Sequence, residues 1–204
     1  MISTSELSKR RTLRQQLKRK RLAIDPAARI NAANCIAVQL LEYLNTLESG
    51  YVAGYWAVAG ELPLHAVQIG LSKKHIWCLP VVQSDKTLKF LPWQAGDRLQ
   101  QNSYGIPEPL GENASQLQAN DLVAVLVPLV GFDRLGFRLG MGGGYYDRSF
   151  AFRREKLTSP KLIGIAYSNQ EIENTDMLSE WDIPMDIIVT EKELINCRPA
   201  VVDH

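Results

Sequence analysis

The segment that most constrains the fold is residues 127–150, which reads VPLVGFDRLGFRLGMGGGYYDRSF. It continues an apolar run over residues 122–130, whose β-branched residues are typical of a buried strand. Six glycines follow, at positions 131, 136, 140, 142, 143 and 144. From Tyr145 the apolar spacing becomes helical, with Asp147 in the first turn. The segment therefore predicts a strand, then a glycine-rich loop, then the start of a helix.

This order of elements favours an anion site. A glycine-rich loop before a helix offers backbone N–H groups and a positive dipole end to a phosphate. The loop matches neither a Walker A motif nor GxGxxG, so the alternative is a tight turn in which Asp147 only complements the helix dipole. Arg134 and Arg138 lie among the glycines, and arginine is suited to bidentate phosphate contacts. Asp147 is placed to hold Mg²⁺ beside such a phosphate, because this ion usually takes only one or two carboxylates from the protein.

Length and composition fit one soluble α/β domain over residues 1–204, with 46% hydrophobic and 22% charged residues. No apolar run approaches the roughly 20 residues that span a bilayer. The basic N-terminus has no apolar segment after it, which argues against a secretory signal. It also runs on without a cleavage-like break, which disfavours a transit peptide. Three widely spaced cysteines without CxxC indicate reduced thiols and argue against a zinc site, so we expect a cytoplasmic protein.

The positive charge is concentrated near the N-terminus. The chain has a net charge of +1, yet eight cations and no acid lie within residues 9–21, so the remainder is at 1 − 8 = −7. The eight are Lys9, Arg10, Arg11, Arg14, Lys18, Arg19, Lys20 and Arg21. Such a segment is compatible with nucleic-acid binding, with a solvated helix face, or with a cationic wall over a polyphosphate. A basic helix has no built-in preference between DNA phosphates and those of a nucleotide, so all three readings stay open.

The rest of the chain alternates between strand and helix patterns. Helices are expected over residues 4–24, 26–47 and 62–72, and Asp25-Pro26 is a typical cap and first residue for the second. Strands are expected over residues 51–58, 75–82, 87–93, 161–167 and 186–190, and a short helical turn over 191–196. This alternation predicts an α/β sheet with parallel strands. No internal repeat or domain boundary is visible.

Three groups of residues follow expected strands, where open α/β sheets bind ligands. One is Glu61, just after the first strand, although a carboxylate at a helix start is more often a dipole partner. The second is the long polar segment 94–120, whose YGIPEP motif favours extended backbone. The third is the glycine-rich segment. His65 and His75 have no partner at ligand spacing, and no catalytic triad or HExxH motif is present.

These motifs together resemble the 5-formyltetrahydrofolate cyclo-ligase family, also called 5,10-methenyltetrahydrofolate synthetases. The resemblance rests on GFDRLGFRLGMGGGYYDR, on YGIPEP, on Gly60-Glu61, on the basic first helix and on WDIPMDIIVT, which ends at Thr190. It implies a single three-layer Rossmann-like α/β domain with a mainly parallel central sheet and helices on both faces. It also implies ATP- and Mg²⁺-dependent closure of 5-formyltetrahydrofolate to 5,10-methenyltetrahydrofolate, with release of ADP and phosphate.

The resemblance further implies roles for particular residues. Arg138, Glu61 and Tyr146 become the candidate catalytic residues. ATP would be bound by Lys9, Arg10, Arg14, Arg134, Arg138, Gly140, Met141, Gly142, Gly143, Gly144, Tyr145 and Asp147. Folate would contact Glu61, Trp93, Tyr104, Gly105, Ile106, Pro107, Glu108, Pro109 and Tyr146. Asp147, with Asp186 as a second carboxylate, would hold the metal. Many family members have lysine where Arg10 stands, so Lys9 and Arg10 compete for one phosphate-binding role.

We therefore expect an ATP-dependent ligase that acts on 5-formyltetrahydrofolate as a monomer, without nucleic acid or membrane partners. Two other readings compete with it. One is a nucleic-acid-binding protein that uses the basic helix and in which the glycine loop is structural. The other is a related ATP-dependent ligase or phosphotransferase with a different substrate.

Overall fold

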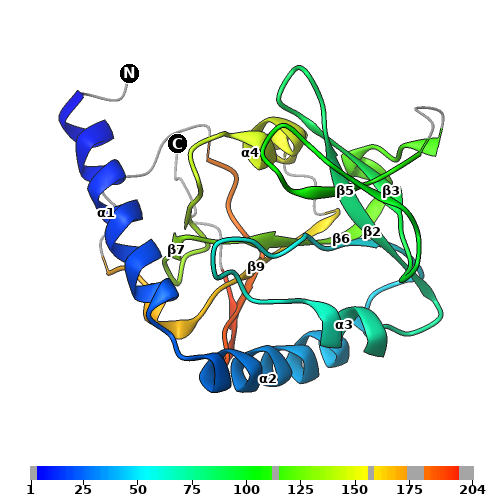
Figure 1. The fold of residues 1–204 in the computed structure, drawn as a ribbon, viewed down its shortest axis with the longest axis horizontal. Helices are drawn as coiled ribbons and strands as arrows, with labels where there is room; N and C mark the ends of the chain where they lie inside the picture. The colour runs from blue at the N-terminus through cyan, green and yellow to red at the C-terminus, as the bar shows by residue number, and fades with distance from the viewer. Residues whose placement is uncertain (1–3, 112–114, 156–158, 174–181, 198–204) are drawn as a thin grey trace.

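The apolar run before the glycines forms β6 (Leu122–Pro128), the middle strand of a seven-stranded sheet (Figure 1). The computed structural model describes residues 4–111, 115–155, 159–173 and 182–197. Residues 124–127 of β6 are at most 1% exposed. A near-continuous apolar sequence is what a parallel strand covered on both faces requires.

The sheet is mainly parallel, with strand order β11-β10-β9-β6-β1-β2-β3. The parallel strands are β1 (Gly50–Ala53), β2 (His75–Val82), β6, β9 (Lys161–Ile165) and β10 (Ile187–Val189). The two edge strands, β3 (Leu88–Pro92) and β11 (Leu194–Asn196), run antiparallel to their neighbours. From β1 the chain passes to β2, towards one edge of the sheet, and from β6 it passes to β9, towards the other edge. The direction of winding therefore reverses between the neighbouring strands β1 and β6.

Each face of the sheet is covered by a separate layer. The α2 helix (Pro26–Leu44) and α3 (His65–Gly70) cover one face, and α4 (Tyr145–Ser149) with the 3₁₀ turn Ala151–Glu155 covers the other (Figure 1). Alternate residues of β6 serve the two layers, because successive side chains of a strand point to opposite faces. Leu126 packs in the cluster of α2, and Val127 packs in the cluster of Phe150. The predicted three-layer α/β class is confirmed.

The two N-terminal helices differ in how much of their surface is buried. α1 (Thr4–Leu22) lies along one side of the molecule (Figure 1) and buries Leu17 against Val130 and Leu139. At its other apolar positions Leu7 and Leu22 remain exposed. The cap predicted for α2 is present, because the Asp25 side chain accepts hydrogen bonds from the N–H groups of residues 27 and 28.

The structure corrects two expectations about strands and helices. The expected strand 51–58 ends at Ala53; the next residue, Gly54, lies against the Trp77 ring, where a Cβ would be 2.0 Å from a ring atom. The chain then leaves the sheet. The helical turn expected over 191–196 is wrong, since these residues contain strand β11, which pairs with β10. Sequence spacing alone does not reveal such a pairing.

The long polar segment is also more ordered than expected. It forms a hairpin of β4 (Leu99–Gln101) and β5 (Pro107–Pro109), so the second half of the YGIPEP motif is a strand and its first half lies in the turn. A second hairpin, of β7 (Gly131–Phe132) and β8 (Arg138–Leu139), shapes the first half of the glycine-rich segment. Within the described ranges, no helix has the length and apolar character needed to cross a membrane.

Candidate active site at the sheet switch point

Two loops diverge where the winding of the sheet reverses, at the carboxyl ends of β1 and β6. The β1 loop carries Glu61, and the β6 loop is the glycine-rich segment. Neighbouring parallel strands whose connections leave in opposite directions open a crevice at this point, which is the usual ligand site of such sheets. The topology therefore brings together two of the three groups that the sequence placed after strands.

The backbone of the glycine loop requires glycine at two positions. Gly142 has φ +98° and Gly144 has φ +69°, conformations that other residues rarely adopt. Gly144 immediately precedes α4. Met141, Gly142 and Gly143 are exposed, and Gly140 has no atom within 4 Å of where a Cβ would be. The loop thus presents bare backbone that a bound group can approach closely.

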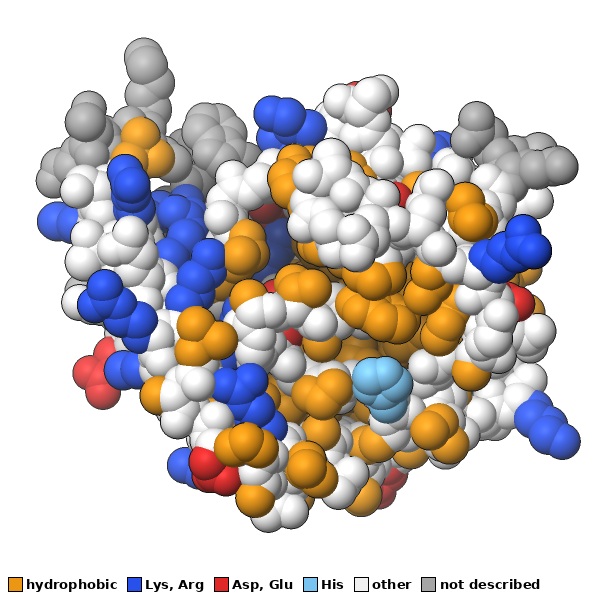
Figure 2. Space-filling view, viewed as in Figure 1, with side chains coloured by type: hydrophobic (Ala, Val, Ile, Leu, Met, Phe, Trp, Pro, Cys, Tyr) orange, Lys and Arg blue, Asp and Glu red, His pale blue; other side chains and the backbone are white. Residues whose placement is uncertain are grey.

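Cations of α1 face this loop. Arg14 Nε donates to the Gly140 carbonyl at 2.8 Å, and its guanidinium lies near Gly142. Arg10, one helical turn earlier, pairs with Asp182 at 2.8 Å, whereas Lys9 is exposed. Burial, followed by the nearby Arg10, lowers the pKa of Arg14. Figure 2 shows Lys and Arg side chains gathered over the region of α1. An anion near Arg14 would offset this unfavourable concentration of charge.

Arg138 and Asp147 form an ion pair beneath the loop. Arg138 is 9% exposed, and its Nη2 donates to Asp147 Oδ1 at 2.7 Å. Its Nη1 donates to the Ile183 carbonyl, and the Ile183 N–H donates to the same Asp147 Oδ1 at 3.2 Å. Both contacts use Oδ1, and among the described residues no hydrogen bond reaches Oδ2. One carboxylate oxygen beside the loop therefore remains suitable for a hard cation.

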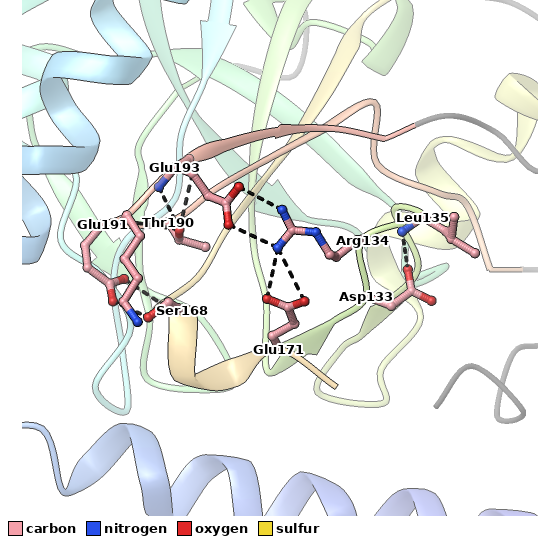
Figure 3. Close-up of polar contacts among 9 residues, drawn as sticks. Asp133, Arg134, Leu135, Ser168, Glu171, Thr190, Glu191 and Glu193 are labelled. Carbon is pink, nitrogen blue, oxygen red and sulfur yellow. Dashed lines mark hydrogen bonds and ion pairs between the residues drawn. The ribbon is translucent and has the colours of Figure 1, made fainter. Parts of the chain in front are cut away.

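Arg134 and Asp186 have surroundings that differ from those expected. Arg134 is held between Glu193, at 2.7 Å, and Glu171, at 3.3 Å (Figure 3). Its side chain is half exposed there, on the outer side of the β7–β8 hairpin. Asp186 accepts one hydrogen bond from Arg153 at 2.6 Å and another from the Leu162 N–H at 2.7 Å. Both Asp186 oxygens thus stabilise the sheet layer, and neither side chain is directed to the glycine loop by these contacts.

An aromatic pocket of about 350 Å³ opens beside the β1 loop. Its walls come from α2, the β1 loop, α3, β2 and the end of β3, and include Tyr55, Trp56, Trp77, Trp93, Glu61 and His65. The rings of Trp56 and Trp93 meet edge to face, with centroids 6.0 Å apart. The indole N–H of Trp93 is buried and has no partner within the described structure. Figure 2 shows hydrophobic side chains lining a hollow on this face. A flat, partly polar ring system fits such walls.

Glu61 joins this pocket to the rest of the site. Its Oε2 accepts a hydrogen bond from the Val58 N–H at 3.1 Å, and its Oε1 lies 3.8 Å from Arg21 Nη1. Burial raises the pKa of Glu61, and the Val58 N–H, Arg21 and Lys18 oppose that rise. Burial, and then the charge of Glu61, raises the pKa of Tyr146, which therefore keeps its phenolic proton.

The YGIPEP motif lies next to α4 and is absent from the pocket wall. The hydroxyls of Tyr104 and Tyr145 are 2.5 Å apart. Glu108 is buried and accepts hydrogen bonds from the Val82 N–H and from Asn102, so its role within this hairpin is structural. Tyr104 and Gly105 are exposed, Ile106 is half-buried, and the contact with Tyr145 places Tyr104 beside the start of α4.

Sequence reasoning did not identify several residues of the site. Trp56 and Trp77 received no role, because no motif contains them, and Arg21 was named only as one of the eight cations of the basic first helix. The only available signal was the concentration of aromatic residues near the ends of predicted strands, and aromatic residues are equally common in a core.

A mainly parallel α/β sheet with a cationic glycine loop and an aromatic pocket at its switch point is the architecture expected of a nucleotide-binding α/β enzyme. The model of the 5-formyltetrahydrofolate cyclo-ligase family matches residues 6–191. The chain belongs to this family and is an ATP-dependent cyclo-ligase. The family assignment made from the motifs is confirmed; Trp181, the first residue of WDIPMDIIVT, lies outside the described residues.

Individual relatives agree with the family match. The chain is 31% identical to a 5-formyltetrahydrofolate cyclo-ligase of Haemophilus influenzae, over 89% of this chain and 97% of the relative. It is 30% identical to the Escherichia coli protein of the same name, over 87% and 98%. Its fold is similar to that of the Aquifex aeolicus 5,10-methenyltetrahydrofolate synthetase, with a TM-score of 0.78, 28% identity and 96% coverage of both chains.

Proposed function

We propose that this protein closes 5-formyltetrahydrofolate to 5,10-methenyltetrahydrofolate at the expense of ATP, with Mg²⁺ bound to the nucleotide. One observation carries the proposal: the glycine loop with Arg14, Arg138 and Asp147 and the pocket loop with Glu61 leave the sheet at the same switch point, where Tyr146 of α4 lies close enough to Glu61 to feel its charge. Two substrates that must react with each other need adjoining sites. The cyclo-ligase names of the relatives support the same reaction.

The chemistry requires activation of a poor leaving group. The formyl oxygen attacks the γ-phosphorus, and the bond from this phosphorus to the β–γ bridging oxygen breaks, releasing ADP. The N10 lone pair then attacks the formyl carbon and N10 loses its proton. The oxygen leaves as inorganic phosphate, so the product is the methenyl cation. For phosphoryl transfer of this kind the protein mainly has to position the two reactants and to compensate the negative charge of the phosphates. A site rich in arginine and glycine agrees with these requirements.

We assign the phosphates to Arg14, Arg10 and the backbone of the glycine loop from Gly140 to Tyr145. Arg10 is preferred over Lys9 because it is four residues from Arg14 and therefore shares its helix face. Mg²⁺ would be held by Asp147 together with phosphate oxygens, and when bound it neutralises charge that develops during transfer. Arg138 orients the Asp147 carboxylate. Arg134 is left out of the set, because its guanidinium is already engaged by Glu171 and Glu193.

The pterin is assigned to the aromatic pocket. Glu61 would accept hydrogen bonds from the ring, and Trp93 would donate its unpartnered indole N–H. Tyr146 and the exposed part of the Tyr104–Pro109 segment would border the path from the glycine loop to the pocket.

The direct test is the methenyl chromophore. Purified protein with 5-formyltetrahydrofolate, ATP and Mg²⁺ is expected to develop the near-ultraviolet absorbance of 5,10-methenyltetrahydrofolate and to release one ADP per product. Omission of ATP or chelation of Mg²⁺ is the control. Absence of the chromophore together with salt-sensitive binding to duplex DNA would favour the nucleic-acid hypothesis. If ATP were converted to ADP only when a compound other than 5-formyltetrahydrofolate was supplied, the protein would be a related ligase with a different substrate.

Glu61→Gln is expected to raise KM for 5-formyltetrahydrofolate by about tenfold and to change KM for ATP by less than about twofold, because one charged hydrogen-bond acceptor is lost. Burial raises the pKa of Glu61, so its carboxylate is lost, as pH falls, at a higher pH than the ordinary value of about 4.3. KM for the folate should therefore rise on acidification in the wild type. Steady-state kinetics from pH 4.5 to 8 should show that this rise of the folate KM at low pH is absent from Glu61→Gln. If Glu61→Gln changed only KM for ATP, the assignment of Glu61 to the folate would be contradicted.

A further inference from the structure

Arg21 is a fully buried arginine for which the proposed mechanism has no use. It lies in the last turn of α1, and only 1% of its surface is exposed. Desolvating a guanidinium is costly even when it is paired. An apolar side chain of similar size would fill the same space without that cost, so the contacts of the charged head group need an explanation.

Those contacts span the switch point. Arg21 Nε and Nη2 both donate to the Ala59 carbonyl, at 3.2 and 2.9 Å. Its Nη1 donates to the Leu129 carbonyl at 3.2 Å and lies 3.8 Å from Glu61 Oε1. Ala59 belongs to the loop after β1, and Leu129 follows the end of β6. One side chain from α1 therefore ties together the two loops that form the crevice.

The loop that carries Glu61 has a backbone that needs such support. Ala59 has φ +50°, in the left-handed region that residues with a Cβ seldom occupy. Strained residues persist where surrounding contacts hold them. Gly60, with φ +78°, comes next and leads directly to Glu61. The two hydrogen bonds from Arg21 to the Ala59 carbonyl restrain this turn two residues before the carboxylate.

We infer that Arg21 is a positioning residue that holds the Ala59–Glu61 turn, and with it the Glu61 carboxylate, in the orientation that receives the folate. The inference rests on the proposed function, because it assigns Glu61 to the pterin. The two loops should depend unequally on Arg21. The Leu129 carbonyl also accepts a hydrogen bond from Gln170 Nε2 at 2.7 Å, whereas no second donor to the Ala59 carbonyl exists among the described residues. Loss of Arg21 should therefore affect the folate side more than the nucleotide side.

Arg21→Lys tests this asymmetry, because lysine keeps the charge but cannot donate to both carbonyls in the same fork geometry. We expect KM for 5-formyltetrahydrofolate to rise about tenfold, with KM for ATP changed by less than about twofold. The matched control is Arg19→Lys, an exposed arginine of the same helix, which should leave both constants unchanged. Equal losses for the two substrates would show a general effect on the fold and would overturn the inference.

A double-mutant cycle with Glu61→Gln separates positioning from packing. If Arg21 acts through Glu61, adding Arg21→Lys to Glu61→Gln should raise the folate KM by no more than about twofold further, because coupled residues are non-additive. A full tenfold increase in the double variant would mean that Arg21 acts independently of Glu61, contrary to the inference.

A measurement on the wild-type protein covers the case in which Arg21→Lys fails to fold, and it does not depend on turnover. The Arg21 Nε–H signal in ¹⁵N–¹H spectra should shift with pH at the same midpoint as the Glu61 side-chain carbon, and that shift should vanish in Glu61→Gln. The charge of Glu61 interacts with Lys18, Tyr55 and Tyr146, and burial raises the pKa of both tyrosines. Arg29 and His65 line the same pocket, so it is the loss of the shift in Glu61→Gln that assigns it to Glu61. An Arg21 signal that ignores Glu61 would overturn the inference. A negative chromophore assay would overturn the proposed function and the assignment of Glu61 to the folate, whereas this coupling separately reports whether Arg21 and Glu61 interact.

Discussion

Asp147→Asn is expected to lower kcat by at least about a hundredfold at saturating ATP and millimolar Mg²⁺. The asparagine amide keeps the size of the side chain but removes the anionic oxygen assigned to the metal, and losing one preorganised charge contact costs about this much in comparable sites. The apparent Mg²⁺ concentration for half-maximal rate should rise as well. Initial rates of chromophore formation across a Mg²⁺ titration measure both quantities.

Asp186→Asn is the informative companion variant, because Asp186 is the other carboxylate that the sequence offered for the metal. Its oxygens accept hydrogen bonds from Arg153 and from the Leu162 N–H. We therefore expect Asp186→Asn to lower Tm while the Mg²⁺ dependence stays that of the wild type. The reverse order, with the Mg²⁺ dependence altered only in Asp186→Asn, would move the metal site to Asp186.

The parts of the fold that the sequence predicted well are those dictated by local patterns. β2 was expected over residues 75–82 and is found there, because it is a short β-branched run between polar residues. The start of α2 followed from Asp25 and Pro26. The first strand was predicted too long, because the apolar residues 55–58 form a pocket wall where they were expected to continue the sheet. An apolar pattern does not distinguish between these two uses.

The candidate site was predictable to the extent that its chemistry lies within one segment. The glycine loop, Arg138 and Asp147 are close in sequence, and the structure joins the last two directly. The aromatic pocket was only partly foreseen, since its walls come from α2, the β1 loop, α3, β2 and the end of β3, which meet only in the folded sheet. Arg134 shows what local reasoning leaves out: its neighbours in sequence suggested a phosphate, and Glu171 and Glu193 reach it from distant segments.

Arg138→Met should reduce both catalysis and stability. The buried guanidinium fixes Asp147 and the Ile183 carbonyl, so its removal leaves a carboxylate without its cation beside the glycine loop. Breaking a fully buried pair costs about 3–5 kcal/mol. The Asp147 side chain is 27% exposed, so we expect a loss of about 2–3 kcal/mol in the free energy of unfolding, because water can solvate part of the charge. Urea denaturation measures this loss, and kcat should fall by at least about tenfold.

The double variant Arg138→Met with Asp147→Asn distinguishes an unpaired charge from lost packing. Once Asp147 is neutral, removal of Arg138 no longer leaves a carboxylate unpaired, so the double variant should be more stable than the sum of the two single losses predicts, by about 1 kcal/mol or more. Its kcat should resemble that of Asp147→Asn alone, since we propose that Arg138 serves the reaction partly by orienting that carboxylate. Strictly additive losses in stability would mean that the two side chains are not coupled in the fold, and strictly additive losses in kcat would mean that Arg138 serves the reaction independently of Asp147.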